Sequence, residues 1–507
     1  MILSCQNLSK TFVDRPILKQ ASFQLEEHEK AAIVGVNGAG KTTLLKMIIG
    51  QLPADEGLIT FAKDKTFGYL AQQSDLSSSH TIYEELLSVK QDLVSMEQQL
   101  RDLEESMKHC EGTQLEEIMN RYTRMTHDFE VRGGLLYKSE LTGVLKGLSF
   151  LDEDFDKQIS TLSGGQKTRV SLAKLLLQSP DLIILDEPTN HLDIASISWL
   201  ETYLRSYKGA VLIVSHDRYF LDRVVTKVIA IENGLVRSYA GNYSDYAAKA
   251  AMLRKAAVNA YLKQQEEIHH QQQVIDKLKS FNREKSIKRA ESREKMLDKM
   301  ELLEKPVEIR DDMHLKLTPQ IISGNDVLSI EDLSKHFGSL TLFEHVDIEI
   351  KRGEHVAIIG DNGTGKTTLL KIINELESMD SGQIRLGSKV EIGYYDQEHH
   401  VLHSEKTLFD EISDDYPTLT NTQIRNTLAA FLFTGDDVFK KISELSGGER
   451  GRVSLAKLML SNANFLILDE PTNHLDITSK EILEQALNDY EGTCLLYTSP
   501  SPRDGAT

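Results

Sequence analysis

The sequence predicts an α/β protein built from two copies of one domain, with a helical insertion inside the first copy and a helical segment between the two. Three observations support this fold. Three long motifs occur twice in the same order. Short apolar runs of strand length precede the first motif and begin the third. In the insertion and the linker, apolar residues recur at helical spacing. With 507 residues, the chain is long enough for several domains, each with its own core.

The repeated motifs define the two copies. GVNGAGKTTLLK, from residue 35, recurs as GDNGTGKTTLLK from residue 360. LSGGQKTRVSLAKLLL, from residue 162, recurs as LSGGERGRVSLAKLML from residue 445, and IILDEPTNHLDI, from residue 183, as LILDEPTNHLDI from residue 466. Three long matches in one order exclude a chance resemblance. We place the first copy at residues 1–245, a linker at residues 246–325 and the second copy at residues 326–507.

The first copy contains an insertion. Lys41 and Lys366 are 325 residues apart, but Ser163 and Ser446 are only 283 apart, so the first copy has 42 extra residues. They fall at about residues 83–133, and Thr113 with Glu116 predicts a capping box that starts a returning helix. We expect a helical hairpin arm, with a simple surface helix as the alternative. Its first helix has apolar residues at coiled-coil spacing: Leu86, Val89, Leu93, Met96, Leu100, Leu103 and Met107.

The linker combines a helical composition with a cluster of positive charge. Residues 277–295 hold eight basic and three acidic residues, a charge of +5 inside a chain of −19. Two helices joined near residues 281–282 would place this charge at an exposed tip. Such runs are common on solvated helix faces, but the contrast with the acidic chain favours a partner with a phosphate backbone. The basic residues are Lys277, Lys279, Arg283, Lys285, Lys288, Arg289, Arg293 and Lys295.

The composition limits the possible settings of the protein. No charge-free segment approaches the roughly 20 residues that a membrane span requires, and the N-terminus lacks the pattern of a secretory signal. Cys5, Cys110 and Cys494 are too far apart in sequence to indicate a disulfide framework or a metal site. We therefore expect a cytoplasmic protein. The excess of 77 acidic over 58 basic residues argues against general nucleic-acid binding outside the linker.

Each GxxxxGKT motif directly follows an apolar run and so lies between a strand and a helix. In this setting the glycines allow consecutive backbone N–H groups to face phosphate oxygens, and the helix N-terminus adds positive charge. Lys41 and Lys366 would contact the outer phosphates of a nucleotide, and the hydroxyls of Thr42 and Thr367 would bind Mg²⁺. The two motifs thus predict two nucleotide sites.

In both copies a buried strand is expected to end in two adjacent carboxylates. Asp186 and Asp469 can bind Mg²⁺ directly or through water. Glu187 and Glu470 are then available to orient or deprotonate the attacking water, and we predict that they are catalytic. A helix cap would account for one acidic residue at each position but not for two.

These motifs together resemble those of the ATP-binding-cassette superfamily. The resemblance rests on both P-loops, both LSGG motifs, Gln72 and Gln397, the pair His191 and Asp193, and His216 in VSHDRYF. It implies two P-loop ATP-binding-cassette domains that enclose two ATP molecules. Each ATP would lie between the P-loop of one cassette and the LSGG motif of the other.

The same resemblance assigns roles to single residues. Phe12 and Phe337 would pack on adenine, Gln72 and Gln397 would sense Mg²⁺ and the γ-phosphate, and His216 would hold that phosphate during catalysis. The nucleotide-binding residues are then Phe12, Gly35, Asn37, Gly38, Gly40, Lys41, Thr42, Thr43, Ser163, Gly164, Gly165, Gln166, Phe337, Gly360, Asn362, Gly363, Gly365, Lys366, Thr367, Thr368, Ser446, Gly447, Gly448 and Glu449. The metal ligands are Thr42, Gln72, Asp186, Thr367, Gln397 and Asp469.

Within the superfamily, the chain resembles the ABC-F family. The arm, the helical linker with its basic tip and the sequence DEPTNHLD in both cassettes support this resemblance. It implies an ATP-hydrolysing monomer, without a membrane subunit, whose cassettes pair within one chain and which binds the ribosome near the exit-tRNA site. The basic residues of the linker would contact the phosphates of ribosomal RNA and tRNA. The partner of the arm stays open.

Other functions stay open on the sequence. An ATPase subunit of a membrane transporter can also contain two fused cassettes, and a DNA-maintenance ATPase could close the basic hairpin on DNA. Within the ABC-F family, proteins that protect ribosomes from antibiotics often have a longer linker loop. The short turn in this linker therefore favours a housekeeping translation factor over a resistance protein.

The end of the second copy departs from the pattern of the first. His216 lies 23 residues after Asp193, and the same step from Asp476 reaches Ser499. AVLIVSHDRYF in the first copy is matched by TCLLYTSPSPR in the second, although proline cannot donate hydrogen bonds within a sheet. We expect a truncated second cassette with a foreign tail, and a genuine degenerate site is the alternative.

This departure would affect the two composite sites differently. We expect ATP hydrolysis mainly at the site that retains its histidine. That site combines Lys41, Glu187, His216 and Ser446, whereas the site without a histidine combines Lys366, Glu470 and Ser163.

Overall fold

The computed structural model describes most of the chain. It covers residues 1–507 except residues 13–14, 72–77, 191, 281–283, 301–302, 304–318, 320, 339, 361–363, 396–401, 432, 434, 446, 462, 473–474, 476 and 498–507. Six predicted site residues lie outside the described residues: Gln72, Arg283, Asn362, Gly363, Gln397 and Ser446. The side chain of Lys285 is outside them as well.

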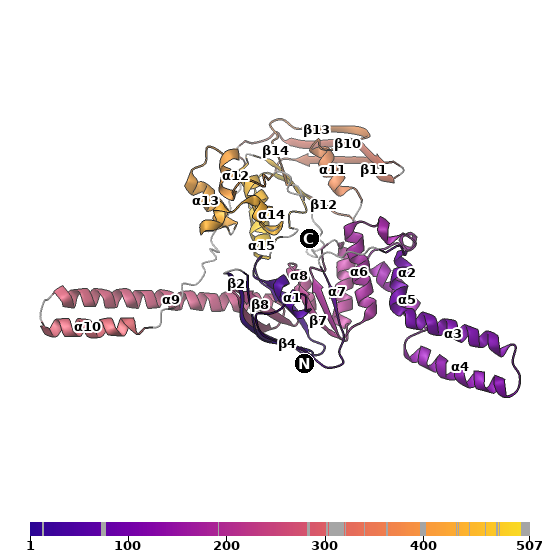
Figure 1. The fold of residues 1–507 in the computed structure, drawn as a ribbon. Helices are drawn as coiled ribbons and strands as arrows, with labels where there is room; N and C mark the ends of the chain where they lie inside the picture. Colours follow the sequence, from indigo (N-terminus) through magenta and orange to yellow (C-terminus); the bar gives the residue numbers. More distant parts are fainter. Residues whose placement is uncertain are drawn as a thin grey trace. The chain divides into compact units, whose positions relative to one another are not determined.

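A six-stranded, largely parallel sheet forms the centre of the first copy, in the order β5-β6-β7-β3-β8-β9 (Figure 1). Its strands are β3 (Lys30–Val34), β5 (Phe67–Leu70), β6 (Leu182–Asp186), β7 (Ala210–Val214), β8 (Lys227–Glu232) and β9 (Leu235–Ala240). Every residue of β3, β6 and β7 is buried, as expected for parallel strands that are covered on both faces. This burial explains the continuous apolar runs that precede the motifs.

A smaller antiparallel sheet completes this copy, in the order β2-β1-β4. It contains β1 (Leu3–Phe12), β2 (Arg15–Leu25) and β4 (Glu56–Phe61). Helix α1 (Lys41–Ile48) contributes Leu44 and Leu45 to a core that also takes apolar residues from both sheets. The main core of the first copy therefore lies directly behind the GxxxxGKT loop.

Three further helices of the first copy begin at capping side chains. They are α6 (Gly164–Gln178), α7 (Ile194–Ser206) and α8 (Arg218–Val224). Ser163, Asp193 and Asp217 each accept a hydrogen bond from a backbone N–H of the helix that follows. Such caps satisfy N–H groups that have no partner inside the helix. The LSGG, DEPTNHLD and SHD sequences thus set where these helices start.

The second copy repeats this plan with a four-stranded sheet in the order β12-β16-β15-β14, which matches β3-β7-β6-β5. No described strand corresponds to β8 or β9. The strands are β10 (Asp326–Phe337), β11 (Leu340–Lys351), β12 (His355–Ile358), β13 (Ser381–Leu386), β14 (Ile392–Tyr395), β15 (Phe465–Asp469) and β16 (Thr493–Tyr497). The helices are α11 (Lys366–Ile373), α12 (Leu408–Asp415), α13 (Asn421–Ala430), α14 (Gly447–Leu460) and α15 (Ile477–Asn488).

The insertion is a helical hairpin, which confirms the predicted arm (Figure 1). Its helices α3 (Gln91–Met107) and α4 (Thr113–Val131) lie between α2 (Ile82–Leu87) and α5 (Tyr137–Gly147). Leu93, Leu100 and Phe129 form its small core with Tyr137.

Two details predicted for the arm are wrong. The apolar seam does not run unbroken from Leu86, because a 3-10 turn at Ser88–Lys90 separates α2 from α3. The capping box at Thr113 is absent, because Gly112 occupies the N-cap position and no side chain caps α4.

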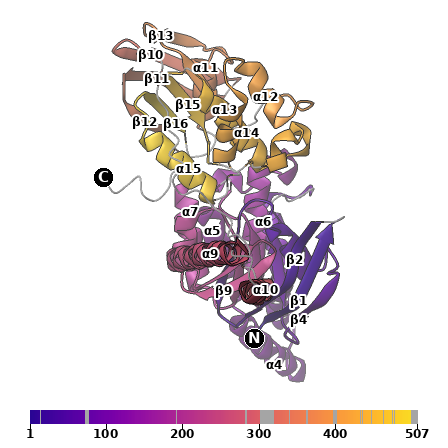
Figure 2. The same ribbon diagram turned by 90° about the vertical axis from the view of Figure 1, so that its left-hand side faces the viewer.

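The linker forms a compact unit of its own, Ala240–Met313. Within it, α9 (Tyr243–Ser280) and α10 (Glu284–Asp298) lie side by side as a hairpin (Figure 1 and Figure 2). Ile275 and Ala290 are buried between them, and Lys279 Nζ lies 2.6 Å from Glu294 Oε1. The predicted helical-hairpin linker is confirmed. No helix in the described part of the chain is long and apolar enough to cross a membrane.

Candidate nucleotide site

The first GxxxxGKT loop connects β3 to α1 and has the backbone of a phosphate cradle. Gly38 and Gly40 have φ angles of 79° and 99°, which favour glycine. A Cβ atom at Gly40 would come within 2.5 Å of Ile17. Lys41 Nζ donates hydrogen bonds to the carbonyl oxygens of Gly35 and Val36, at 2.8 and 3.2 Å. The ammonium group is therefore held over the loop whose N–H groups would face phosphate.

The second loop, between β12 and α11, repeats this geometry where it is described. Gly365 has a φ of 89°, and Lys366 Nζ donates to the Gly360 carbonyl oxygen at 2.6 Å. The predicted threonines open the two helices: Thr42 and Thr43 in α1, Thr367 and Thr368 in α11.

The two carboxylates after β6 are held at the end of the sheet beside the first loop. Asp186 is the last residue of β6, and Glu187 has a φ of 51°, uncommon for a residue other than glycine. The N–H of Glu187 donates to the Val214 carbonyl oxygen at 2.8 Å. Burial raises the pKa of Asp186 to about 6 and that of Glu187 to about 7, because a charged carboxylate loses its hydration there.

His216, which the sequence analysis placed in the same site as Glu187, lies against its side chain. It follows β7, the neighbour of β6, and its backbone N–H donates to Glu187 Oε2 at 3.2 Å. Its Nε2 atom lies 3.5 Å from Glu187 Oε1. A carboxylate with a pKa near neutrality and an imidazole thus meet at one edge of the sheet, which is an arrangement suited to moving a proton near pH 7.

The second copy holds its carboxylates in the same way. Asp469 is buried and accepts a long hydrogen bond of 3.4 Å from Thr367 Oγ1. Glu470 has a φ of 47°, and its N–H donates to the Tyr497 carbonyl oxygen at 2.7 Å. Oxygen ligands of this kind, close to a P-loop, fit Mg²⁺.

The strand register shows what corresponds to His216 in the second copy. Asp186 pairs with Val214 in the first sheet, and Asp469 pairs with Tyr497 in the second. His216 lies two residues after Val214, so the equivalent residue is Ser499, which is outside the described residues. Tyr497 itself places its ring 4.9 Å from Lys366 Nζ.

Comparisons with known proteins agree with this geometry. A family model described as ABC transporter matches residues 18–190 and 343–473, and a second model with the same description matches residues 229–317. The protein "ABC transporter F family member 5" of Arabidopsis thaliana is 35% identical over 97% of this chain and 71% of its own length. This chain belongs to the ABC-F family. The family predicted from the motifs is therefore confirmed.

Two more similar proteins support the same family and fold. "Putative ATP-binding protein YdiF" of Bacillus subtilis is 50% identical over 98% of the ABC-F chain and 77% of its own length. The solved structure of "RNase-L Inhibitor" matches with a TM-score of 0.59 and 20% identity, covering 97% of this chain and 85% of that one. The latter likeness concerns the fold alone. The two copies are thus ATP-binding cassettes arranged in tandem.

The LSGG motif of the first cassette of this ABC-F protein opens α6. Ser163 and Gln166 form a capping box, in which each side chain accepts a hydrogen bond from the backbone N–H of the other residue. Gly164 and Gly165 begin the helix, so its free N–H groups are available to an anion. In the second cassette α14 begins with Gly447, Gly448 and Glu449.

The predicted aromatic residues stand at the ends of β1 and β10. Phe12 is 45% and Phe337 49% exposed, so both rings present surface that a flat ligand could cover. Sequence analysis did not single out Lys10 and Lys335, whose ammonium groups lie over these rings at 5.7 and 5.0 Å from the centroids. The available signal was the recurrence of Ser-Lys two residues before each phenylalanine.

Proposed function

We propose that this ABC-F protein binds Mg²⁺-ATP at both cassettes and hydrolyses it mainly at the first. The observation that carries the proposal is the contact of Glu187 with His216, 3.5 Å apart, beside a P-loop. This arrangement would place a base beside the phosphates of a nucleotide in the P-loop, and the Glu187 pKa of about 7 suits proton transfer at neutral pH.

Each described residue of the first site has a task in this proposal. The N–H groups of the loop would bind phosphate oxygens, and Lys41 would exchange its carbonyl contacts for the outer phosphates. Thr42 and Asp186 would hold Mg²⁺, which draws negative charge from the phosphates. Glu187 would accept a proton from the attacking water, and His216 would keep Glu187 and the γ-phosphate in place.

The remaining predicted residues extend the proposal to both sites. Gln72 and Gln397 would bind Mg²⁺, Phe12 and Phe337 would carry the base, and Thr367 with Asp469 would hold the second metal ion. Pairing of the cassettes within the chain would bring Ser163 and Ser446 to the nucleotides. ATP binding would then favour the closed pair, because only that pair makes both sets of phosphate contacts.

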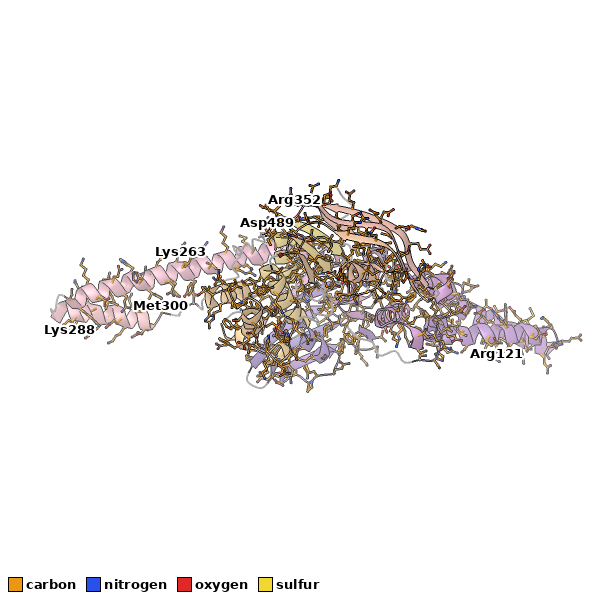
Figure 3. The ribbon with its side chains drawn as sticks, turned by 90° about the horizontal axis from the view of Figure 1, so that it is seen from above. Arg121, Lys263, Lys288, Met300, Arg352 and Asp489 are labelled. Carbon is orange, nitrogen blue, oxygen red and sulfur yellow. The ribbon has the colours of Figure 1, made fainter. Side chains whose placement is uncertain are left out.

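We further propose that the linker binds the ribosome near the exit-tRNA site, through the phosphates of ribosomal RNA and tRNA, and so modulates translation. The supporting observation is the basic sequence around the end of the α9–α10 hairpin, where Figure 3 places Lys288. Lys277, Arg289 and Lys295 have exposed side chains in the same segment. The ion pair of Lys279 with Glu294 reduces, but does not cancel, this charge. Phosphate contacts of this kind depend strongly on salt.

A co-sedimentation experiment tests the ribosome proposal. A variant with Glu187→Gln and Glu470→Gln would retain ATP, and we expect it to sediment with ribosomes only when ATP is present. Adding Lys285→Glu, Lys288→Glu and Arg289→Glu should weaken this binding and reduce its dependence on salt, because three phosphate contacts are lost.

A matched charge reversal controls for net charge alone. Arg254→Glu, Lys255→Glu and Lys263→Glu make the same change on α9, and Figure 3 shows Lys263 well away from Lys288 along the hairpin. This control should bind ribosomes as tightly as the starting variant. Absence of ribosome binding by an ATP-loaded, folded protein would reject the ribosome proposal. Sedimentation with membranes would favour a transporter subunit, and DNA-stimulated turnover a DNA-maintenance ATPase.

A further inference from the structure

The backbone before each of the two exposed phenylalanines is held by a similar set of contacts in the two cassettes. We propose that Lys10 with Asp55, and Lys335 with Asp380, are positioning pairs that fix Phe12 and Phe337 as platforms for the adenine base. The inference rests on the proposed binding of ATP and adds to it residues that position the base rather than the phosphates. The supporting contacts surround Asp55 in the first cassette and Asp380 in the second.

In the first cassette, Asp55 joins the end of β1 to the start of β4. Lys10 Nζ donates to Asp55 Oδ1 at 2.6 Å, and the backbone N–H of Thr11 donates to Oδ2 at 2.8 Å. The N–H of Asp55 donates in turn to the Ser9 carbonyl oxygen at 3.0 Å. These hydrogen bonds hold the pKa of Asp55 below its usual value, so the carboxylate stays ionised. Asp55 therefore forms hydrogen bonds with all three residues before Phe12, through its carboxylate and its backbone N–H.

The second cassette reproduces the two backbone contacts of the aspartate, whereas its lysine lies farther from the aspartate and donates hydrogen bonds to Glu377 and Ser378 instead. The N–H of His336 donates to Asp380 Oδ2 at 2.6 Å, and the N–H of Asp380 donates to the Ser334 carbonyl oxygen at 3.2 Å. Lys335 Nζ lies 3.7 Å from Asp380 Oδ1 and 3.0 Å from Glu377 Oε1. The lysine, the aspartate and the phenylalanine of the two sets are each 325 positions apart, as are the two P-loop lysines.

The strand that carries each phenylalanine is also bent in the same way. Asn7 in β1 and Asp332 in β10 have φ angles of 51° and 53°, and a register shift follows each of them. A Cβ atom at Gly57 would come within 2.5 Å of the Asn7 carbonyl oxygen, and one at Gly382 within 2.6 Å of Leu333 Cα. The bend thus requires glycine in the neighbouring strand, and it sets the direction of the lysine and the phenylalanine.

The lysine ammonium group has two effects on the ring beside it. Lys10 and Lys335 are buried, and their charges lie over rings that remain nearly half exposed. A cation over one face of an aromatic ring is attracted by its π electrons and holds the ring in place. The ring then offers its remaining surface to a base, and base stacking on a preordered ring loses less conformational entropy.

Nucleotide binding distinguishes this role from a purely structural one. The probes are ATP and inorganic tripolyphosphate, which has the phosphates but no base. In the full chain, Lys10→Met with Lys335→Met, and separately Asp55→Asn with Asp380→Asn, should raise the Kd for ATP about threefold to tenfold. The Kd for tripolyphosphate should stay unchanged. Lys10→Arg with Lys335→Arg keeps the charge and should restore most of the ATP affinity.

The first cassette contains a matched control pair. Lys65 Nζ and the N–H of Thr66 donate to Asp181 at 3.0 Å each, the same pattern as around Asp55. The phenylalanine that follows, Phe67, is also exposed, but it stacks on Phe61 and pairs with Leu182, at the end of β6 opposite to Asp186. Asp181→Asn should lower the melting temperature as much as Asp55→Asn and leave both Kd values unchanged. This control separates loss of an ion pair from loss of the platform.

Each other outcome is decisive. Unchanged ATP affinity in the lysine and aspartate variants would overturn the positioning role. An equal loss for ATP and tripolyphosphate would also overturn it, since the effect would then act on the whole site. Failure of the unmodified protein to bind either probe would reject the proposed ATP binding instead, which is a separate result.

Discussion

Strands β3 and β12 hold the same place in the two cassettes but have different surroundings. β3 pairs with β7 on one side and β8 on the other, and all five of its residues are buried. β12 pairs with β16, and no described strand lies along its other edge. Val34 is 3% exposed, whereas its counterpart Ile359 is 57% exposed. A similar apolar run is therefore fully buried in one cassette and partly exposed in the other.

The difference extends to the nucleotide loops. A Cβ atom at Gly35 would come within 2.7 Å of the Ile231 carbonyl oxygen in β8, so β8 supports the first loop from behind. At Gly360 the nearest such atoms belong to Thr364 and Lys366, at 3.5 and 3.9 Å, in the same loop and the helix that follows it. An outer strand thus packs against the first glycine-rich loop, and no described strand does so at the second.

The largest effect is expected from giving the second cassette equivalents of β8 and β9, which its described residues do not contain. Replacing residues 498–507 by residues 215–242 should supply equivalents of β8 and β9 that cover Ile359 and the open edge of β12. We expect the melting temperature of the second cassette to rise by about 5 °C or more, because burying several apolar side chains contributes a few kcal/mol. Calorimetry measures the change. A graft of equal length made of glycine and serine should give no rise, and a failure of the native graft would contradict the comparison.

The next largest effect concerns turnover. Glu187→Gln should lower ATP hydrolysis about a hundredfold, because it removes the proposed base that contacts His216. Glu470→Gln should lower it less than about threefold, since the register places Ser499 where the first cassette has its histidine. Phosphate release from each single variant provides the measurement. An equal loss in both variants would show that the two sites contribute alike.

A pair of alanine substitutions tests the difference in burial directly. Val34→Ala should cost about 1–3 kcal/mol in the free energy of unfolding, because it leaves a cavity between three strands. Ile359→Ala should stay within about 0.5 kcal/mol, as is usual for an exposed side chain. Denaturant titrations of both variants give these values. Equal costs would mean that Ile359 is as well packed as Val34.

The smallest effect concerns a difference between the two proposed adenine platforms, Phe12 and Phe337. His336 lies between Glu344 and Asp380, at 3.0 and 3.2 Å, and hydrogen bonding to them raises its pKa. A raised folded-state pKa gives stability that is complete below the ordinary histidine pKa and is lost as pH rises through the folded value. His336→Gln should therefore lower the melting temperature at pH 6 and not at pH 8.5. Thr11→Gln, the matched change in the first cassette, should show no such pH dependence.

Repeated motifs made most of the fold predictable. The apolar runs of β3 and β6 are buried strands, and Ser163 caps α6 as a serine before a helical pattern predicts. The motifs also assigned Glu187 and His216 to one site, and the structure brings the two side chains into contact. In each case, the local sequence determines the backbone, and neighbouring parallel strands bring their carboxyl ends to one edge of the sheet.

Other features depend on information that the sequence pattern does not contain. Thr113 and Glu116 have the spacing of a capping box, but Gly112 adopts a φ of 68° and begins the helix one residue earlier. The pattern predicts a helix start near these two residues, but it does not determine which residue occupies the N-cap position. Lys10 and Asp55 are 45 residues apart, and they meet only because β1 pairs with β4 in a particular register. Such a pairing could not be derived from single motifs.

The helical arm distinguishes the first cassette from the second in the described part of the chain. The first cassette places residues 88–136 between α2 and α5, whereas the second joins α12 to α13 with residues 416–420. Both versions continue into a helix that begins at an LSGG motif, and the ends of the arm are held by its own small core. The second cassette thus has the same fold without an arm at this position. The helix that begins at the LSGG motif therefore forms with or without the insertion before it.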